Sequence, residues 1–147
     1  MAFVVDFHRD DTVLQFFQVR RILEPAATAM AATRMTESEV AELRKILDSL
    51  PEDPSIEQLV AGDLEFHHRI AAGSGNAVLC SFVESLAGPT TRARIWRGLS
   101  QKNAMEKTRE QHTAICDAIA ARQPEVARAW ATVHIAGVEE WLREALA

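Results

Sequence analysis

The 147-residue sequence contains no tyrosine, and regular alternation of valine, isoleucine and threonine is scarce. Because such alternation is typical of strands, its scarcity together with abundant alanine favours an all-α protein. No stretch reaches the roughly 18 apolar residues of a membrane span, and the start MAFVVDFHRDD lacks the pattern of a signal peptide. The two cysteines, Cys80 and Cys116, lack paired-motif spacing and are expected to be buried, reduced thiols. We therefore expect a cytoplasmic protein without membrane association.

Basic residues are also few. Lysine and arginine number 16 against 21 aspartates and glutamates, which gives a net charge of -5. A chain that binds nucleic acid on its own normally presents a basic face to the phosphates. The only basic cluster here is the small group Arg92, Arg94 and Arg97. Direct DNA binding by these 147 residues is therefore not expected.

The hydrophobic periodicity predicts six helical segments separated by short connections. Capping-box signals begin two of them, Thr36 with Glu39 and Ser55 with Gln58. Asn76 is expected to cap the fourth segment, after the helix-ending sequence GSGN at 73–76. The segments cover about 11–33, 36–50, 55–72, 77–99, 101–122 and 124–146.

Proline predicts two irregularities within these segments. Pro25 is expected to kink or split the first helix because proline lacks the backbone N–H that a helix interior uses, and Ala-Gly-Pro at 87–89 indicates a break in the fourth. Short connections favour antiparallel neighbours. We therefore expect residues 11–147 to form one all-α antiparallel bundle of six to seven helices.

Polar residues fall on the apolar faces of two of these helices. At about 100° per residue, Asp63 and His67 lie at the centre of the apolar stripe of the third helix, one turn apart, whereas His68 points away. The same arithmetic places His112 in the middle of the stripe of the fifth helix, beside Cys116.

The sixth helix adds another inward histidine. With Val126 taken as the reference of its apolar stripe, Trp130 and Trp141 share the stripe with His134, which lies inside it but less centrally. We interpret the two tryptophans as core packing or cavity wall. Three helices thus each direct one imidazole inward, and one of them adds a carboxylate.

One inward carboxylate with three inward imidazoles is a donor set typical of a divalent metal site. The Asp-x-x-x-His spacing of Asp63 and His67 places two ligands one turn apart on one helix face. A single inward histidine is more often a core residue hydrogen-bonded to a carbonyl, and Asp63 could instead pair with a histidine or an arginine. The pattern alone leaves both alternatives open.

Four stretches resemble the FCD domain, the C-terminal effector-binding and dimerisation domain of the FadR branch of GntR-type bacterial transcription regulators. They are VRRILEPAATAMAATRMT at 19–36, DLEFHHRIAAGSGN at 63–76, EQHTAICDAIAARQPEVARAW at 110–130 and VHI at 133–135. The block D-x-x-F-H…G-N, followed by two spaced histidines, is the most specific part. The resemblance extends over nearly the whole chain.

The resemblance implies a metal bound by Asp63, His67, His112 and His134, the four residues that the helix faces select. Zinc is the expected ion, with nickel or another divalent transition metal as the alternative. The effector is expected to be a small carboxylic acid, bound beside the metal or directly to it.

The same resemblance suggests effector-binding residues. Arg20 matches an arginine of the first helix that commonly lines the cavity, and the alternative is a surface salt bridge with Glu24 at i,i+4. Arg94 and Arg97 are expected to border the cavity. An effector contact by Asn76 is the remaining, weaker expectation.

GntR regulators begin with a winged-helix DNA-binding domain, which has no counterpart in this sequence. AFVV at 2–5 resembles the last strand of that domain's wing, so residues 1–10 are interpreted as a residual linker. An excised domain, a start assigned too late and a natural stand-alone sensor all explain this. DNA binding is expected only through a winged-helix domain, and the helical domain is expected to be a homodimer.

The leading interpretation is therefore a metal-dependent sensor domain rather than an enzyme. A hydrolase-like enzyme on the same metal site is one alternative, but it requires a general base near the open coordination position. On the inward faces we expect no spare acid or histidine for that role. A purely structural dimerisation domain is the other alternative.

Overall fold

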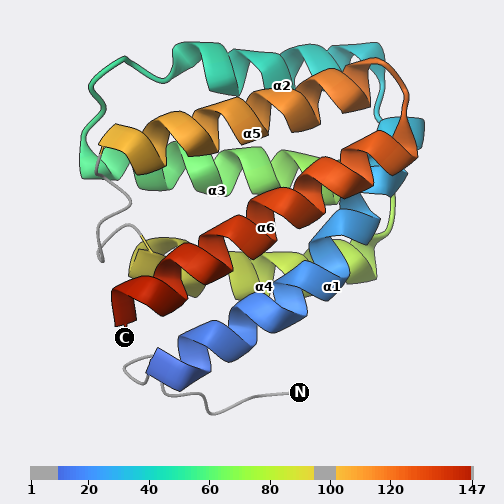
Figure 1. The fold of residues 1–147 in the computed structure, drawn as a ribbon. Coiled ribbons are helices and arrows are strands. Elements are labelled where there is room, and N and C mark those ends of the chain that lie inside the picture. Colours follow the sequence, from blue (N-terminus) through green and yellow to red (C-terminus); the bar gives the residue numbers. More distant parts are fainter. Residues whose placement is uncertain (1–9, 95–101, 147) are drawn as a thin grey trace.

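The computed structural model describes residues 10–94 and 102–146, with side chains for all of these except 10, 89, 92–94 and 102 (Figure 1). This part of the chain consists of helices and short connections, without a strand. The helices are α1 (Asp10–Arg34), α2 (Glu37–Ser49), α3 (Ile56–Gly73), α4 (Ala77–Arg94), α5 (Lys102–Ala120) and α6 (Pro124–Leu146). The all-α prediction is confirmed. The proposed wing-like segment at 2–5 lies outside the described residues.

Local sequence signals account for the helix boundaries. The Thr36 hydroxyl accepts a hydrogen bond from the N–H of Glu39, and Ser55 forms a reciprocal capping box with Gln58. Asn76 caps α4, because its side-chain oxygen accepts from the N–H of Leu79 at 3.0 Å. The three N-caps and the capping box of Ser55 and Gln58 are confirmed, whereas only one of the two bonds of a capping box is found between Thr36 and Glu39.

Neither α1 nor α4 is split at its proline, and a kink at Pro25 stays a prediction. Pro25 lies inside a continuous α1, and α4 continues through 87–89 to Arg94. Proline removes one helical hydrogen bond, but a helix packed against several neighbours retains enough tertiary contact to continue. Here α1 packs against α3, α4, α5 and α6.

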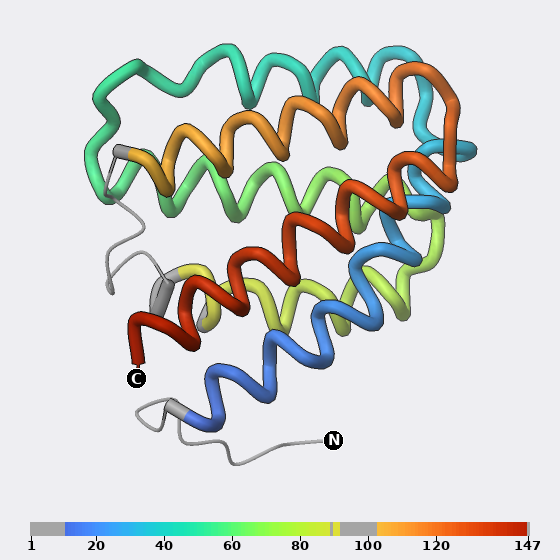
Figure 2. Tube along the Cα trace, viewed as in Figure 1, coloured from blue at the N-terminus to red at the C-terminus, as the bar shows by residue number. Residues whose placement is uncertain are grey.

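The helices form two groups of three. Helices α2, α3 and α5 pack side by side, and α1 packs against α4 and α6 (Figure 1). The two groups meet where α3 contacts α1 and α4, and where α5 contacts α6 and α1. The start of α1 lies beside the end of α6, where Val13 and Leu142 share an apolar cluster (Figure 2).

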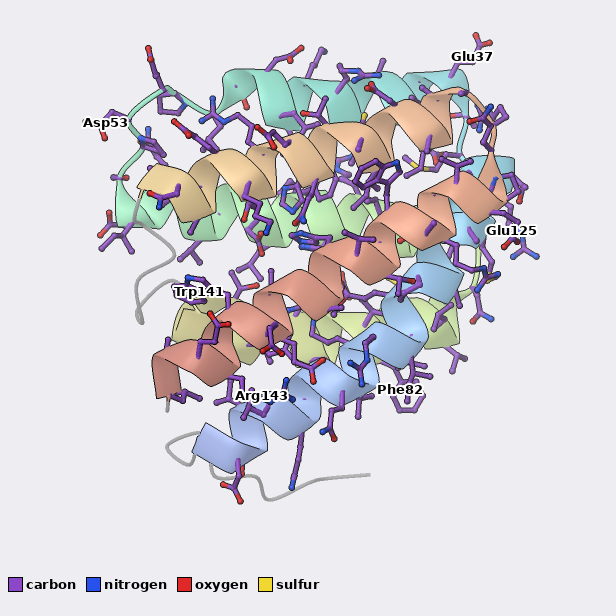
Figure 3. The ribbon with its side chains drawn as sticks, in the orientation of Figure 1. Glu37, Asp53, Phe82, Glu125, Trp141 and Arg143 are labelled. Atoms are coloured by element: carbon purple, nitrogen blue, oxygen red, sulfur yellow. The ribbon has the colours of Figure 1, made fainter. Side chains whose placement is uncertain are left out.

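The buried face of α6 differs from the predicted one. Val126 and Trp130 are 43% and 40% exposed, so their assignment to the core was wrong. The helix instead buries its neighbouring face, which carries Ala127 and Ala131. Small side chains allow α6 to pack closely on the alanine-rich part of α1, which a tryptophan would prevent. Trp141 is half-buried against the cluster at the other end of α6 (Figure 3).

Two apolar clusters divide the core along α1 and α6. One contains Phe17 of α1 and Ile135 of α6, and the other contains Ala31 of α1 and Ala131 of α6. Between them, both helices bury polar side chains, Arg20 and Glu24 on α1 and His134 on α6. The candidate site therefore lies at the boundary between the clusters. In the part of the chain that is described, the helices are too short or too polar to cross a bilayer.

Candidate metal centre

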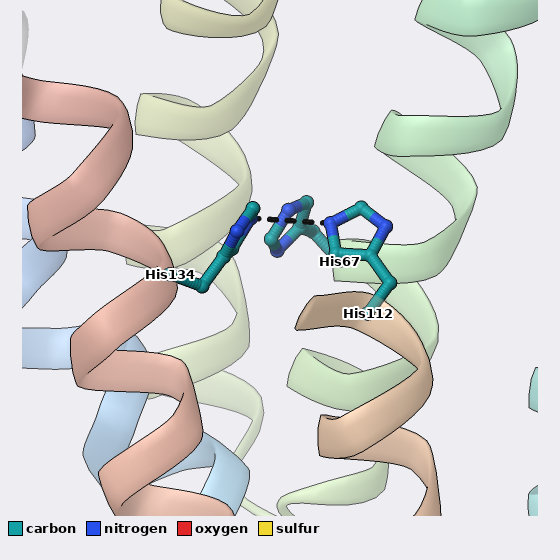
Figure 4. Close-up of side chains that lie close together, drawn as sticks. All are labelled: His67, His112 and His134. Atoms are coloured by element: carbon teal, nitrogen blue, oxygen red, sulfur yellow. Dashed lines mark hydrogen bonds between the residues drawn. The ribbon is translucent and has the colours of Figure 1, made fainter. Parts of the chain in front are cut away.

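The four predicted ligands are all buried. Asp63 and His67 come from α3, His112 from α5 and His134 from α6, and none is more than 7% exposed. The three imidazoles point toward one another across the boundary between the two helix groups (Figure 4). His68, the neighbour of His67, lies on the exposed side of α3. The predicted orientations of these five side chains are confirmed.

The ring nitrogens converge on a small volume. One nitrogen from each of His67, His112 and His134 lies within 4.8 Å of the other two. The Nε2 atoms of His112 and His134 are 3.1 Å apart (Figure 4). Asp63 Oδ1 lies 3.8 Å from His67 Nε2 and 3.7 Å from His112 Nε2.

Outer contacts fix the orientation of two rings. Glu24 Oε1 lies 3.1 Å from His67 Nδ1, and Gln111 Oε1 lies 2.8 Å from His134 Nδ1. Both oxygens are acceptors, so each Nδ1 carries the proton and each Nε2 presents its lone pair to the cluster. His67 Nε2 is buried and has no hydrogen-bond partner. A buried lone pair without a donor is costly, and its position suits a metal ligand.

The remaining side chains are also held in place. His112 stacks on Phe66, with ring centroids 4.1 Å apart and an interplanar angle of 17°. Thr91 donates a hydrogen bond from its hydroxyl to Asp63 Oδ2 at 2.9 Å, which leaves Oδ1 on the histidine side. Ligands of one tetrahedral zinc ion lie about 3 to 3.5 Å apart, since each bond is about 2.0–2.2 Å. The donor chemistry fits a divalent transition metal, and the distances of 3.1, 3.7 and 3.8 Å among the four side chains are close to this spacing.

Helix α1 contributes Arg20, which the resemblance placed at the cavity, and Glu24, whose contact with His67 was not predicted. Arg20 is fully buried, and its Nε and Nη2 donate to the two Glu24 carboxylate oxygens at 2.5 and 3.2 Å. Its Nη1 donates to Thr90 Oγ1 at 2.9 Å. The pairing with Glu24 matches the alternative given for Arg20, although the pair is buried and not at the surface. An effector contact by Arg20 stays a prediction. Arg20 and Glu24 both follow Phe17 at helical spacing, so the rotation of about 100° per residue applied to the other helices places them on the same face as Phe17.

The Glu24 carboxylate is shared by a guanidinium and an imidazole. Burial alone would raise its pKa, but the charge of Arg20, together with His67, outweighs this effect and lowers the pKa to about 2. Glu24 is therefore ionised at neutral pH. The expected absence of a further buried acid was wrong, because Glu139 of α6 is also buried, paired with Arg21 and Arg143.

Comparison with known proteins decides the family. The family model described as the FCD domain matches residues 15–137. The chain belongs to the FCD domain family.

Two relatives of this FCD domain are transcription regulators. It is 34% identical to the HTH-type transcriptional regulator LutR of Bacillus subtilis (strain 168) over 143 residues, 91% of this chain and 64% of LutR. It is 28% identical to the galactonate operon transcriptional repressor of Escherichia coli (strain K12) over 130 residues, 86% of this chain and 56% of the repressor. The chain thus spans about three fifths of these relatives.

A solved structure shares the fold. Streptococcus agalactiae GntR superposes with a TM-score of 0.72 at 23% identity, over 93% of this chain and 61% of that chain. The shared arrangement confirms the FCD-like helical bundle.

The other three predicted effector residues, Asn76, Arg94 and Arg97, have no described contact with Asp63 or the three histidines. The Asn76 side chain caps α4, and an effector contact by it stays a prediction. Arg94 ends α4, with only its backbone described, and Arg97 lies outside the described residues. Their roles also stay predictions.

The buried pair of Arg20 and Glu24 makes a stability test possible. Arg20→Met leaves the Glu24 carboxylate buried without its main counter-charge, which is expected to cost about 3–5 kcal/mol of unfolding free energy. Arg69→Met is the matched control, since Arg69 pairs with Glu65 at the same i,i+4 spacing but both are exposed. Urea unfolding should show a large loss for Arg20→Met and little change for Arg69→Met. Equal effects would contradict the buried pair.

Proposed function

We propose that this FCD domain is the sensor of a GntR-type transcription regulator. It holds one divalent transition metal on Asp63, His67, His112 and His134, and a small carboxylic acid is its effector. The observation that carries the proposal is the convergence of three buried imidazoles and one carboxylate from three helices. The metal, when bound, supplies a positive charge and coordination positions for a carboxylate.

The second layer of contacts supports a metal rather than a structural histidine cluster. Glu24 and Gln111 hold the Nδ1 protons of His67 and His134, which is the usual partner arrangement of metal-bound histidines. A purely structural cluster would be expected to use every buried ring nitrogen in hydrogen bonds, and His67 Nε2 has none.

Two observations support a small acid as effector. One relative is named for a galactonate operon, and galactonate is itself a carboxylate. A cavity of about 50 Å³ reaches Asp63 and His112 between α2, α3 and α5, and its other walls are mostly apolar. A space of this size holds a few water molecules, which the carboxylate group of an effector could replace.

The buried acids give little support to catalysis. Glu24 contacts His67, but with a pKa of about 2 it is a weak base at neutral pH. Its two oxygens are also bound by Arg20. Glu24 therefore serves better to orient His67 than to accept a proton from substrate.

Effector binding is proposed to act on DNA-binding domains through a homodimer. An effector shifts such an equilibrium only if its affinity differs between the two arrangements. Helices α1 and α4 pack against each other, and both carry exposed apolar side chains that support an interface there: Val19, Ile22, Val78 and Phe82. Figure 3 labels Phe82.

Oligomeric state tests this interface. Sedimentation equilibrium should give twice the chain mass for the wild type, and Phe82→Glu should shift it toward the monomer because a buried interface disfavours an unpaired charge. Val133→Glu, at an equally exposed valine of α6, should leave the dimer intact. A wild-type monomer would exclude a dimer formed by this chain.

Elemental analysis tests the metal site. After dialysis that removes weakly held ions, the wild type should retain near one equivalent of transition metal, and Asp63→Ala/His67→Ala should retain almost none. Glu65→Ala is the matched control, because Glu65 is an exposed carboxylate on the same helix. His112→Ala should lower the affinity by more than about a hundredfold. Full metal content in these site variants, with unchanged circular dichroism, would refute the assignment.

The role of Arg20 is tested by effector titration. Arg20→Lys keeps the buried positive charge that Glu24 requires, so metal content should be unchanged. If Arg20 also contacts the effector, loss of the guanidinium should lower carboxylate affinity by about tenfold or more. Calorimetric titration with galactonate and smaller hydroxy acids measures this. Arg109→Lys is the comparison, since Arg109 lines the cavity on the Asp63 and His112 side. If only Arg109→Lys loses affinity, the effector is bound from that side and Arg20 is structural.

A further inference from the structure

A second group of metal-ligating side chains lies outside the buried centre. His68 of α3 and Cys80 and Glu84 of α4 each place one ligand atom within 4.8 Å of the other two. His68 and Glu84 are exposed and in contact through Nδ1 and Oε1, whereas Cys80 is half-buried. The expectation that Cys80 is fully buried was therefore wrong.

The turn between α3 and α4 fixes this arrangement. Cys80 and Glu84 are four residues apart, so they lie on the same face of α4. Gly75 takes a positive φ of 72°, which an L side chain rarely adopts, and Asn76 caps the next helix. The two helices are joined by only three residues between Gly73 and Ala77, so their register is set by this turn. The three ligands therefore do not depend on a long loop for their proximity.

The chemistry of the three groups selects the kind of ion. Thiolate and imidazole are ligands of zinc and related transition metals, whereas calcium and magnesium prefer oxygen. Burial, followed by the charge of Glu84, raises the pKa of the Cys80 thiol, so without an ion it is protonated at neutral pH. Binding a metal would release that proton.

We propose that His68, Cys80 and Glu84 form a second, surface-accessible site for a thiol-binding divalent transition metal such as zinc. Three protein ligands leave a coordination position for water or for a ligand from solution. The adjacent cavity, of about 240 Å³, is lined by His68 and Glu84 and also by His67 of the buried centre. The surface site and the buried centre thus share one neighbouring residue, His67, in the lining of this cavity. This inference does not depend on the proposed sensor function.

Cobalt titration tests the site, because a cysteine ligand gives Co²⁺ a thiolate charge-transfer absorption that histidine and carboxylate do not. His112→Ala, which weakens the buried centre, should still develop this absorption and saturate at one equivalent. Adding Cys80→Ser should abolish the absorption and lower Co²⁺ affinity by at least about tenfold. Adding Cys116→Ala, which removes the buried thiol of α5, should change neither.

His68→Ala provides a second variant at an exposed position, where loss of fold is not expected. It should weaken Co²⁺ binding while circular dichroism stays unchanged. No thiolate absorption at saturating Co²⁺, or an absorption that persists in Cys80→Ser, would overturn the proposal. In that case His68 and Glu84 form only a surface ion pair. If the wild type binds Co²⁺ without a thiolate absorption, only the surface site is refuted, and the proposal for the buried metal site still stands.

Discussion

The Glu24 carboxylate is the contact on which the rest of the site depends. It accepts two hydrogen bonds from the buried guanidinium of Arg20 and lies 3.1 Å from His67 Nδ1. Arg20 cannot be buried without this charge, and His67 would lose the contact that orients its ring. One carboxylate therefore connects the packing of α1 to the geometry of the histidine cluster on α3.

The polar layer also explains why the core has two apolar parts. Along α1 and α6, buried charged and imidazole side chains interrupt the apolar faces between Phe17 and Ala31, and between Ala131 and Ile135. A continuous apolar core would be more stable by simple burial. The interruption is consistent with a site that needs donors held at fixed positions in the interior.

Sequence alone predicted the helices, their caps and the four candidate ligands, because helical periodicity and capping chemistry are local properties. Asp63 and His67 could be placed inward from their own helix. Which face of α6 is buried depends on its neighbour: the alanines of α1 accept Ala127 and Ala131, so Trp130 is left at the surface. The contacts of Glu24 with His67, and of Gln111 with His134, join different parts of the chain, and no local pattern encodes their distances.

Consecutive histidines on one helix have a mechanical consequence. His67 and His68 project from different sides of α3, one into the buried cluster and the other toward Cys80 and Glu84 on α4. Side chains on a rigid helix share its axis, so a small rotation of α3 changes the distances within both groups of side chains at once. Helix α3 therefore couples the two groups: a change in the distances within the buried histidine cluster is accompanied by a change in the distances among His68, Cys80 and Glu84.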